Sequence, residues 1–189
     1  KEVGSIGVEK FIEHFPSGDA EYQDVLDKLA ELNDVRTAAR LLQTIGKTDT
    51  VLEIDGNIER ASLFFAGSIK ATGFIKVDFS IMAGEDIDAG EGICAGGGIY
   101  ARENIGAGEG IYARQSIEAG WGINAGWGIE AGEGLFARDG INAGDGIEAG
   151  WGIYAGDGIE AGWGINAGWG IEAGEGLFAR NGINAGDGI

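Results

Sequence analysis

The sequence predicts a parallel β-solenoid, chiefly because a six-residue phrase repeats from residue 63 to the last residue. An aliphatic residue, Ile or in three places Leu, stands at every sixth position from Leu63 to Ile189. The third position is mostly Ala, so it shares one side of a strand with the first, while the second position points outward. Glycine mostly fills positions four and six, around a polar or aromatic fifth position. Each hexad is interpreted as a short strand and a bend, stacked on its neighbours around one core.

The glycine content supports this interpretation. The chain has 38 glycines, a content often typical of disorder. A disordered linker, however, has no reason to keep an aliphatic residue in strict register over such a length. Glycine on both sides of the exposed fifth position indicates a tight corner that needs positive φ. The lone Pro16 lies outside the repeat, as a hydrogen-bonded sheet requires.

The repeat resembles the hexapeptide-repeat solenoids, which include the left-handed acyltransferase helices and the right-handed bactofilins. In the left-handed family a small residue follows four positions after the aliphatic one, whereas here that slot holds Glu, Asp or Trp. The Ile-x-Ala phrase is also common in bactofilins, although the strict Gly-x-Gly corner is not. The resemblance implies three hexads, or about 18 residues, in each triangular turn. Twenty-one hexads then give about seven turns, and the hand of the coil stays open.

Three short amphipathic helices are predicted before the repeat. Pro16 ends the first, Asp34 is a candidate N-cap of the third, and Gly46 is its C-terminal stop. Residues 1–50 are therefore interpreted as a helical N-terminal cap, and residues 51–189 as the β-helix. We expect the cap to dock on the first rungs and to cover the open end of the solenoid. The apolar residues of the three helices are Val8, Phe11, Ile12 and Phe15; Tyr22, Val25, Leu26, Leu29 and Leu32; and Val35, Ala38, Leu41, Leu42 and Ile45.

The repeat begins irregularly. Val51 already falls on the hexad register, Asn57 breaks it, and Leu63 resumes it. The hexads of residues 63–80 carry aromatic residues where Ala, Gly and polar residues stand later. These rungs are predicted to receive the helices.

Composition restricts the partners. The net charge of −18 argues against direct binding to nucleic acid or to anionic membranes, since both need a basic surface. It fits a soluble protein, including one that meets a basic protein partner. No apolar run reaches the length of a membrane span, and the single cysteine, Cys94, excludes an intrachain disulfide. We expect a cytoplasmic protein without a cofactor.

The inventory for catalysis is poor. His14 is the only histidine, and it lies on the N-terminal piece, whereas hexapeptide acyltransferases need a histidine on the solenoid. The sequence has no serine–histidine–acid arrangement, no Cys/His metal cluster and no phosphate-binding glycine loop joined to a lysine. The chain is therefore predicted not to be an enzyme.

The candidate binding residues occupy the fifth position, at the corners. All five tryptophans stand there, and Trp151 and Trp169 are predicted to stack on adjacent turns. Exposed indoles can bind a protein or stack on sugars, but they can equally shield the glycine-rich corners. Acidic residues share one corner column, and solvated acids are favoured there over a Ca²⁺ site. The candidate binding residues are Trp121, Trp127, Trp151, Trp163, Trp169, Asp139, Asp157 and Glu175, and the full acidic column adds Glu85 and Glu103.

Aromatic residues at position two are followed by Arg at position four in four hexads. A cation–π contact on the outer face is expected for each pair, with a structural role. The pairs are Tyr100/Arg102, Tyr112/Arg114, Phe136/Arg138 and Phe178/Arg180.

Residues 121–147 recur as residues 163–189 with one difference, Asp139 against Asn181. The offset of seven hexads is two and one-third turns, so the copied block lands one face further round. This pattern indicates duplication of a segment.

Two hypotheses for function follow. The first is a non-enzymatic structural or protein-binding scaffold, whose corner tryptophans and acidic columns form the contact surface. The alternative is an acidic decoy or immunity-type inhibitor that occupies the basic, nucleic-acid-binding groove of a partner protein. Self-association through the C-terminal rungs is also expected, because a regular last rung leaves an unpaired edge.

Overall fold

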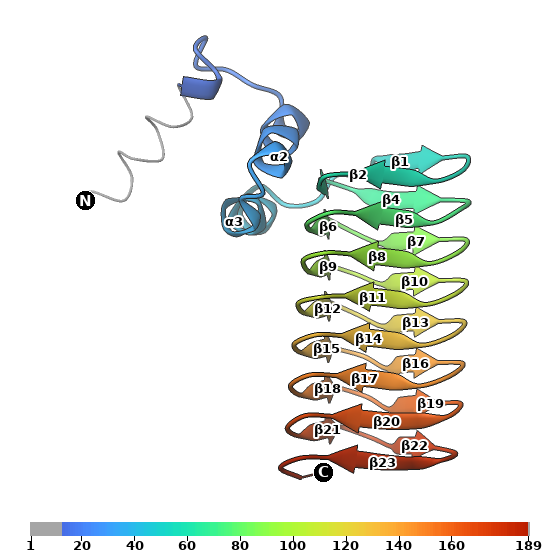
Figure 1. The fold of residues 1–189 in the computed structure, drawn as a ribbon. Helices are drawn as coiled ribbons and strands as arrows, with labels where there is room; N and C mark the ends of the chain where they lie inside the picture. Colours follow the sequence, from blue (N-terminus) through green and yellow to red (C-terminus); the bar gives the residue numbers. More distant parts are fainter. Residues whose placement is uncertain (1–12, 189) are drawn as a thin grey trace, which may run out of the picture.

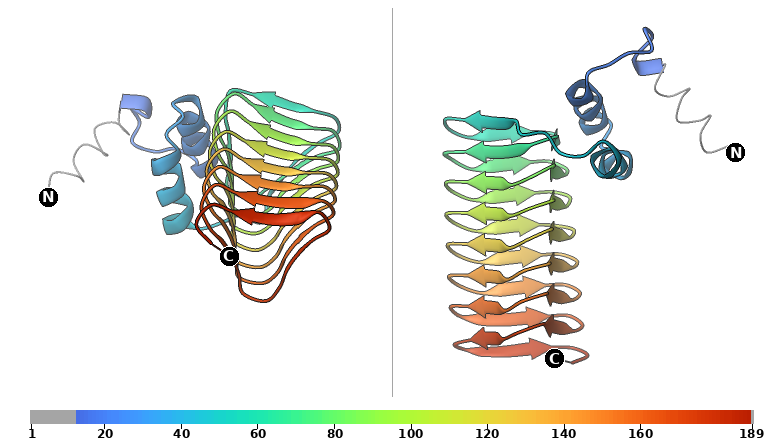
Figure 2. Two further views of the ribbon diagram at one scale, coloured as in Figure 1. Left: turned by 60° about the horizontal axis from the view of Figure 1, so that its bottom comes forward. Right: turned by 180° about the vertical axis from the view of Figure 1, so that it is seen from behind.

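The computed structural model describes residues 13–188 and shows a triangular parallel β-solenoid of about eight turns (Figures 1 and 2). Two α-helices, α2 (Tyr22–Glu31) and α3 (Val35–Ile45), precede it in the described residues. The first predicted helix, over residues 1–16, lies mostly outside them. The predicted fold class is therefore confirmed.

Three parallel sheets form the sides of the triangle, and each turn contributes one strand to each of them. Sheet A holds β1 (Val51–Ile54), β4 (Ser68–Ala71), β7 (Ile87–Ala89), β10 (Ile105–Ala107), β13 (Ile123–Ala125), β16 (Ile141–Ala143), β19 (Ile159–Ala161) and β22 (Leu177–Ala179). Sheet B holds β2 (Ile58–Arg60), β5 (Ile75–Val77), β8 (Ile93–Ala95), β11 (Ile111–Ala113), β14 (Ile129–Ala131), β17 (Ile147–Ala149), β20 (Gly164–Ala167) and β23 (Gly182–Ala185). Sheet C holds β3 (Leu63–Phe65), β6 (Ile81–Ala83), β9 (Ile99–Ala101), β12 (Ile117–Ala119), β15 (Leu135–Ala137), β18 (Ile153–Ala155) and β21 (Ile171–Ala173).

The hand of the coil can be followed in Figure 1. Sheet B lies in front with its strands pointing left, sheet A lies behind with its strands pointing right, and the chain descends from turn to turn. A coil that runs in this way is right-handed, which agrees with the general preference for right-handed crossovers between parallel strands.

In the regular repeat, residue i of one turn pairs with residue i + 18 of the next, as in Ile105↔Ile123. The first turn is different, because Leu52 pairs with Ile69 and Ile58 with Ile75, so that residue i pairs there with residue i + 17. The prediction that Val51 stands in the hexad register is therefore wrong: Leu52 takes the inward place, and Val51 is exposed. The solenoid has about eight turns and not seven because β1 and β2 form most of a turn before the regular repeat begins at Leu63.

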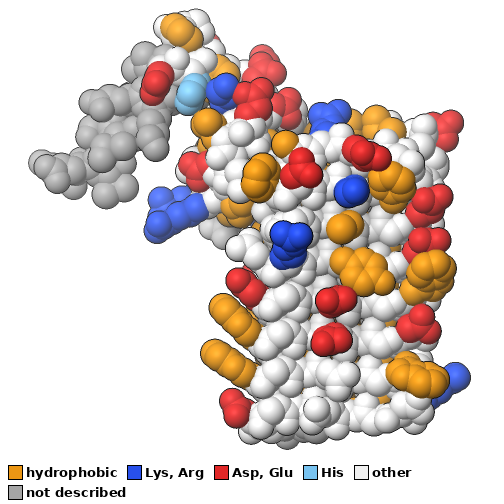
Figure 3. Space-filling view, in the orientation of Figure 1, with side chains coloured by type: hydrophobic (Ala, Val, Ile, Leu, Met, Phe, Trp, Pro, Cys, Tyr) orange, Lys and Arg blue, Asp and Glu red, His pale blue; other side chains and the backbone are white. Residues whose placement is uncertain are grey.

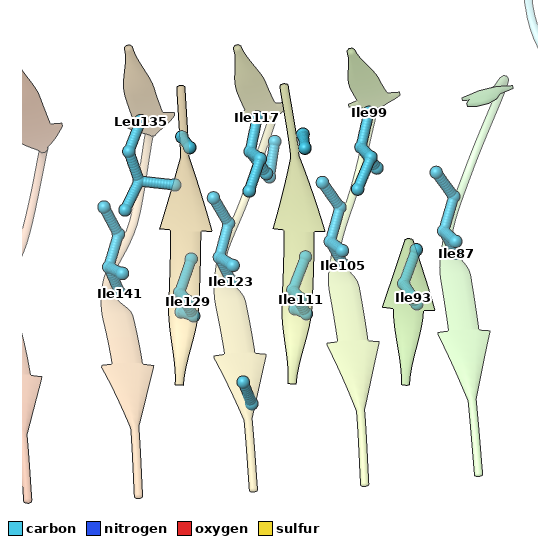
Figure 4. Close-up of a cluster of buried hydrophobic side chains, with 14 of the residues drawn as sticks. Ile87, Ile93, Ile99, Ile105, Ile111, Ile117, Ile123, Ile129, Leu135 and Ile141 are labelled. Carbon is cyan, nitrogen blue, oxygen red and sulfur yellow. The ribbon is translucent and has the colours of Figure 1, made fainter. Parts of the chain in front are cut away.

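The core is a column of aliphatic side chains from all three sheets, with Ala at the third position beside them (Figure 4). Because one hexad cannot bury its own Ile, the stacked turns bury each other's. The first-position residues Ile105, Ile111 and Ile117 have no exposed surface, and they represent one complete turn.

The glycines of the corners serve a different purpose from the predicted one. Within residues 13–188, positive φ occurs at Gly only in Gly18, Gly46, Gly56, Gly182 and Gly188, so most corner glycines do not use the left-handed region. At position four the reason is close approach: a Cβ on Gly126 would collide with the backbone carbonyl oxygen of Gly108 in the turn above. The prediction of positive φ is therefore wrong for the regular corners, where glycine allows tight stacking of backbones.

The two helices are amphipathic, and the predicted start and stop signals of α3 are confirmed. The side chain of Asp34 accepts a hydrogen bond from the Thr37 amide at 3.0 Å, which caps the N-terminus of α3. Gly46 ends α3 with a φ of 97°. The buried helix residues are Leu26, Ala30, Ala38 and Leu42. Leu32 and Ile45, expected on the apolar face, are exposed.

The helices pack against the outer face of sheet C, beside the first turns (Figures 1 and 2). Their buried residues contact Phe64, Ala66 and Met82, and Tyr100 lies at the margin of this cluster. The rough early hexads do receive the helices, as predicted. However, α2 and α3 lie at the side of the solenoid and do not cover its open end, because the apolar surface that matches them is the outer face of sheet C.

Polar contacts fix the helices to sheet C. The Gln23 side chain donates to the Phe64 carbonyl oxygen at 2.9 Å and accepts from the Ala66 amide at 3.1 Å. It therefore provides hydrogen-bond partners for backbone groups in and directly after β3. Arg102 donates from Nη1 to the Leu42 carbonyl oxygen at 2.8 Å, near the C-terminal end of α3. A guanidinium at this end also complements the negative end of the helix dipole.

Candidate functional site

The fifth positions of the hexads form three vertical columns, one at each corner of the triangle. Their backbones continue the hydrogen-bond ladder, as when the Trp169 amide donates to the Trp151 carbonyl oxygen at 2.9 Å. The A–B corner holds Gly73, Glu91, Glu109, Trp127, Asp145, Trp163 and Asn181. The B–C corner holds Phe79, Gly97, Gln115, Glu133, Trp151, Trp169 and Asp187. The C–A corner holds Gly67, Glu85, Glu103, Trp121, Asp139, Asp157 and Glu175.

The five tryptophans are exposed, as the sequence predicts for the fifth position, with between 47% and 65% of their surface accessible. Four of them stand on the two corners that border sheet B, and Trp121 alone stands on the C–A corner. Trp151 and Trp169 stack with ring centroids 5.7 Å apart and an angle of 11° between the planes. This stack is the predicted pairing of adjacent turns, and one broad face of each indole is used by it.

The outer face of sheet B lies between these two tryptophan-bearing corners and faces the viewer in Figure 3. Hydrophobic and acidic side chains follow both of its edges in that view. Trp163 lines a shallow hollow on this face together with Tyr112, Glu130, Glu148 and Asn166. The indole of the A–B corner therefore contributes to the sheet B face.

A second, larger hollow of about 530 Å³ lies higher on the same face. It is lined by residues of both charges, among them Lys76, Asp78, Arg114 and Glu130, and by the exposed Cys94. Both hollows are open surface depressions, so the face offers contact area and little enclosure.

The acidic column of the C–A corner is less uniform than the sequence reasoning assumed. Trp121 stands in the middle of it, one turn below Glu103, and separates Glu85 and Glu103 from the acids below. Counting along the sequence in steps of three hexads reveals this interruption. Lys47 binds the upper pair, with Nζ 2.9 Å from Glu85 Oε1 and 2.6 Å from Glu103 Oε1. The lower acids, Asp139, Asp157 and Glu175, take part in none of the ion pairs found within residues 13–188.

Lys47 and the Glu85 carboxylate perturb each other's titration. The hydrogen bonds to Glu103 and Glu85 raise the pKa of Lys47, and the bond from Lys47, with a second from the Ser68 hydroxyl, lowers the pKa of Glu85. Sequence reasoning missed this contact, because Lys47 lies outside the repeat and both of its partners are distant in the sequence, Glu103 by 56 residues. Its structural effect is to tie the segment after α3 to the C–A corner.

The aromatic–arginine pairs do not behave as expected. The ring contact found in the part of the chain that the structure describes is the Trp151–Trp169 stack, and Arg102 donates a hydrogen bond to the Leu42 carbonyl oxygen at the end of α3. The predicted cation–π role of the pair Tyr100/Arg102 is therefore wrong. Arg102 instead binds the C-terminal end of α3.

Below the helices, the outer face of sheet C continues with side chains in vertical register. Glu118 lies between Tyr100 above and Phe136 below, and Tyr154 follows Phe136. Desolvation raises the pKa of Glu118. It also raises the pKa of Tyr100, and the charges of Glu118 and Glu133 add to that shift.

The raised pKa of Glu118 predicts a pH-dependent effect of Glu118→Gln. A carboxyl with a raised folded-state pKa stabilises the fold below its ordinary pKa and loses that contribution as pH rises through the folded value. Charged Glu118 therefore opposes folding at neutral pH, and the neutral amide should raise the melting temperature there by no more than about 2 °C, because the side chain is exposed. The difference should vanish near pH 4, where Glu118 is protonated.

The measurement is a pair of thermal melts by circular dichroism at pH 7 and pH 4. Glu148→Gln is a matched control on sheet B, since Glu148 lies between Glu130 and Asn166 and has no aromatic side chain opposite it. An equal gain from both variants would show that general charge reduction, and not the surroundings of Glu118, is responsible.

Residues suited to catalysis or metal binding do not gather in the described residues. No group of three His, Cys, Asp or Glu side chains able to hold a metal ion is found there. His14 and Cys94 are exposed, and Cys94 points outward from β8 as predicted. Among the described helices, none has the length and apolar character needed to cross a membrane.

Comparison with protein families, with curated proteins and with solved structures finds no match to this chain. The likeness to hexapeptide-repeat solenoids therefore rests on architecture alone, in the turn of three hexads and the three-sheeted triangle.

Proposed function

We propose that this chain is a non-enzymatic protein-binding scaffold in which the corner tryptophans form the principal contact surface. The observation that carries the proposal is the exposure of all five indoles on a rigid, fully paired frame. None belongs to the core, which consists of aliphatic residues, mostly Ile and Ala. Large aromatic side chains held in fixed positions lose little entropy on binding, and tryptophan is among the residues that most often dominate protein interfaces.

The distribution of the tryptophans supports a broad contact surface. Trp127 and Trp163 stand on one border of sheet B, and Trp151 and Trp169 stand on the other. The duplicated block, which turns by one face, places equivalent tryptophans on different corners. A partner that wraps around an edge, or several partners on different faces, fits this arrangement.

The acidic decoy is the second candidate, and the lower acids of the C–A corner favour it. Asp139, Asp157 and Glu175 form an uninterrupted run of three turns, with no cation bound to them among the described residues. Trp121 and the Lys47 contact, however, shorten the acidic column to this lower half. A long, continuous imitation of a phosphate backbone is therefore less well supported than an aromatic interface.

The two candidates predict opposite effects of mutation and salt. The wild-type chain and two variants, Trp163→Ala/Trp169→Ala and Asp139→Asn/Asp157→Asn/Glu175→Gln, are immobilised and exposed to lysate. Proteins retained by wild type are then quantified by mass spectrometry. For the scaffold, we expect the tryptophan variant to lose at least tenfold in retained partner, with a weak dependence on salt. Retention that falls in the acidic variant and collapses between low and moderate salt would support the decoy.

A partner retained equally by both variants would contradict both candidates. Circular dichroism of each variant provides the folding control, since all five positions are at the surface and their substitution should leave the β-signal unchanged.

A further inference from the structure

The outer face of sheet C carries, below the residues that hold α2 and α3, a second and partly similar group of aromatic, arginine and acidic residues. The upper set consists of an apolar floor, an arginine at position four and two acids on the C–A corner. The floor is Phe64, Met82 and Tyr100, and the polar residues are Arg102, Glu85 and Glu103. Each has an observed partner on the helices or directly after them.

In the upper set, each member has a definite task. The floor covers the apolar face of the helices, Arg102 binds the Leu42 carbonyl oxygen at the end of α3, and the two acids bind Lys47 just beyond that end. Together they recognise an amphipathic helix that is followed by a basic residue.

Three of these residue types recur two turns lower on the same face, while the positions two turns below Met82 and Glu85 hold Glu118 and Trp121. Phe136 stands two turns below Tyr100, Arg138 two turns below Arg102, and Asp139 two turns below Glu103. Tyr154 extends the floor by one turn, in register with Phe136. Asp157 provides the second acid of the corner, directly below Asp139. We define Phe136, Tyr154, Arg138, Asp139 and Asp157 as the lower set.

The lower set is open in this structure. Phe136 and Tyr154 expose 41% and 43% of their surface, whereas Phe64 and Met82, under the helices, expose 1% and 3%. Arg138, Asp139 and Asp157 are also exposed, and none of the ion pairs within residues 13–188 includes them. The apolar floor, the arginine and the acids therefore lack the partners that their upper counterparts have.

We propose that the lower set docks an amphipathic α-helix of a partner protein, one that carries a basic residue directly after its C-terminal end. The site continues an interface that already exists: Figure 1 shows α3 beside β6, so the open part of sheet C begins directly below it. Two turns of the solenoid are about 10 Å, which is the usual distance between the axes of packed helices. A helix on the lower set therefore lies alongside α3.

Stoichiometry and charge argue against a second copy as the regular occupant. Each chain supplies one α2–α3 pair and two docking sets, so exchange of helices between copies always leaves half of the sets empty. A net charge of −18 on each copy also opposes their approach, while it favours a partner with a basic helix end. The proposal adds a second contact surface, on sheet C and the C–A corner, to the protein-binding scaffold, and it rests on that function.

The test uses the full chain and a synthetic probe. The probe is a fluorescein-labelled peptide of about 20 residues, long enough for an isolated helix, with Leu along one face, Ala and Gln elsewhere, and two Lys directly after the helix. A peptide of the same composition in scrambled order is the control. Fluorescence anisotropy should give saturable one-site binding of the helical probe, at least tenfold tighter than that of the scrambled peptide.

Variants then locate the site. Phe136→Ser/Tyr154→Ser should weaken binding of the probe at least tenfold, and Asp139→Asn/Asp157→Asn should weaken it and flatten its salt dependence. Tyr112→Ser, which removes an equally exposed aromatic residue from sheet B, should have no effect. A benzophenone on the apolar face of the probe should crosslink to residues of β12, β15 and β18.

Three results would overturn the proposal: no saturable binding of the probe, binding that Phe136→Ser/Tyr154→Ser leaves unchanged, or crosslinks that map to sheet B. A dimer seen by sedimentation without the probe, and abolished by Phe136→Ser/Tyr154→Ser, would assign the site to a second copy and would equally overturn it. Failure of the broader scaffold function is distinguishable, because that function predicts partners lost on Trp163→Ala/Trp169→Ala, at other corners. The acidic decoy is also distinguishable, because its partner would be lost on Asp139→Asn/Asp157→Asn but kept on Phe136→Ser/Tyr154→Ser.

Discussion

Replacing Ile129 by Ala is expected to lower the free energy of unfolding by about 2–5 kcal/mol, among the largest effects of any single substitution in this chain. Ile129 is 1% exposed, lies in the middle of the solenoid and packs within the aliphatic column (Figure 4). Removing most of its side chain leaves a cavity that the turns above and below cannot close, since each is held by backbone hydrogen bonds on both sides. The loss corresponds to a fall in melting temperature of about 10 °C.

The neighbouring residue is the matched control for this prediction. Glu130 follows Ile129 on the same strand and points outward, so Glu130→Ala should change the free energy of unfolding by less than about 0.5 kcal/mol. Ile129→Val, which removes one methyl group, should fall between the two at about 0.5–1.5 kcal/mol. Urea denaturation followed by circular dichroism measures all three. Equal effects of Ile129→Ala and Glu130→Ala would contradict the assignment of the first position to the core.

The fold of the repeat could be predicted from the sequence because its information is local and repeated. One six-residue phrase defines an inward Ile, an inward Ala and an outward residue. Strands of this kind can bury their inward residues only by stacking around a common core. The exposure of Cys94 and of the five tryptophans follows from the same rule. The irregular first turn was less predictable, because the unit from Ile58 to Leu63 is one residue shorter than a hexad and this shortening depends on how a single turn closes.

The placement of the helices could not be predicted from their own pattern. An apolar stripe shows that a helix needs a partner surface, but it does not show which surface. The clue lay elsewhere, in Phe64 and Met82 at outward positions where later hexads carry polar residues. Contacts such as Arg102 with Leu42, 60 residues apart, follow only once the helices are in place.

The candidate surfaces were partly predictable for the same reason. Columns of residues three hexads apart can be read from the sequence, and the Trp151–Trp169 stack follows from them. The direction in which a corner side chain leans was not predictable, although it decides that Trp163 joins the sheet B face. A binding surface on this scaffold is therefore defined by faces and corners together, and the lower set on sheet C is one example.

The corner glycines give the second large prediction, in which two glycines on either side of Trp163 differ sharply in effect. A Cβ on Gly162 would collide with the carbonyl oxygen of Gly144 in the turn above, whereas a Cβ on Gly164 would lie 3.4 Å from the carbonyl oxygen of Gly182, an ordinary contact. Backbone conformation does not distinguish the two positions, since neither glycine has a φ in the left-handed region. Gly162→Ala should therefore destabilise the fold by about 1–3 kcal/mol, while Gly164→Ala should stay within about 0.5 kcal/mol of wild type.

The expected size of the Gly162 effect comes from places where the chain tolerates a side chain at position four. Arg102 occupies that position, and its amide lies 3.3 Å from its carbonyl acceptor in the turn above. The corresponding distances are 2.9 Å at Gly84 and 3.0 Å at Gly120, one turn above and one turn below. The chain thus accommodates a Cβ at position four with a slightly longer backbone hydrogen bond than at the glycines directly above and below, and we expect a moderate cost in free energy. Urea denaturation of both alanine variants tests this mechanism, and equal stabilities would show that backbone stacking does not require glycine at position four.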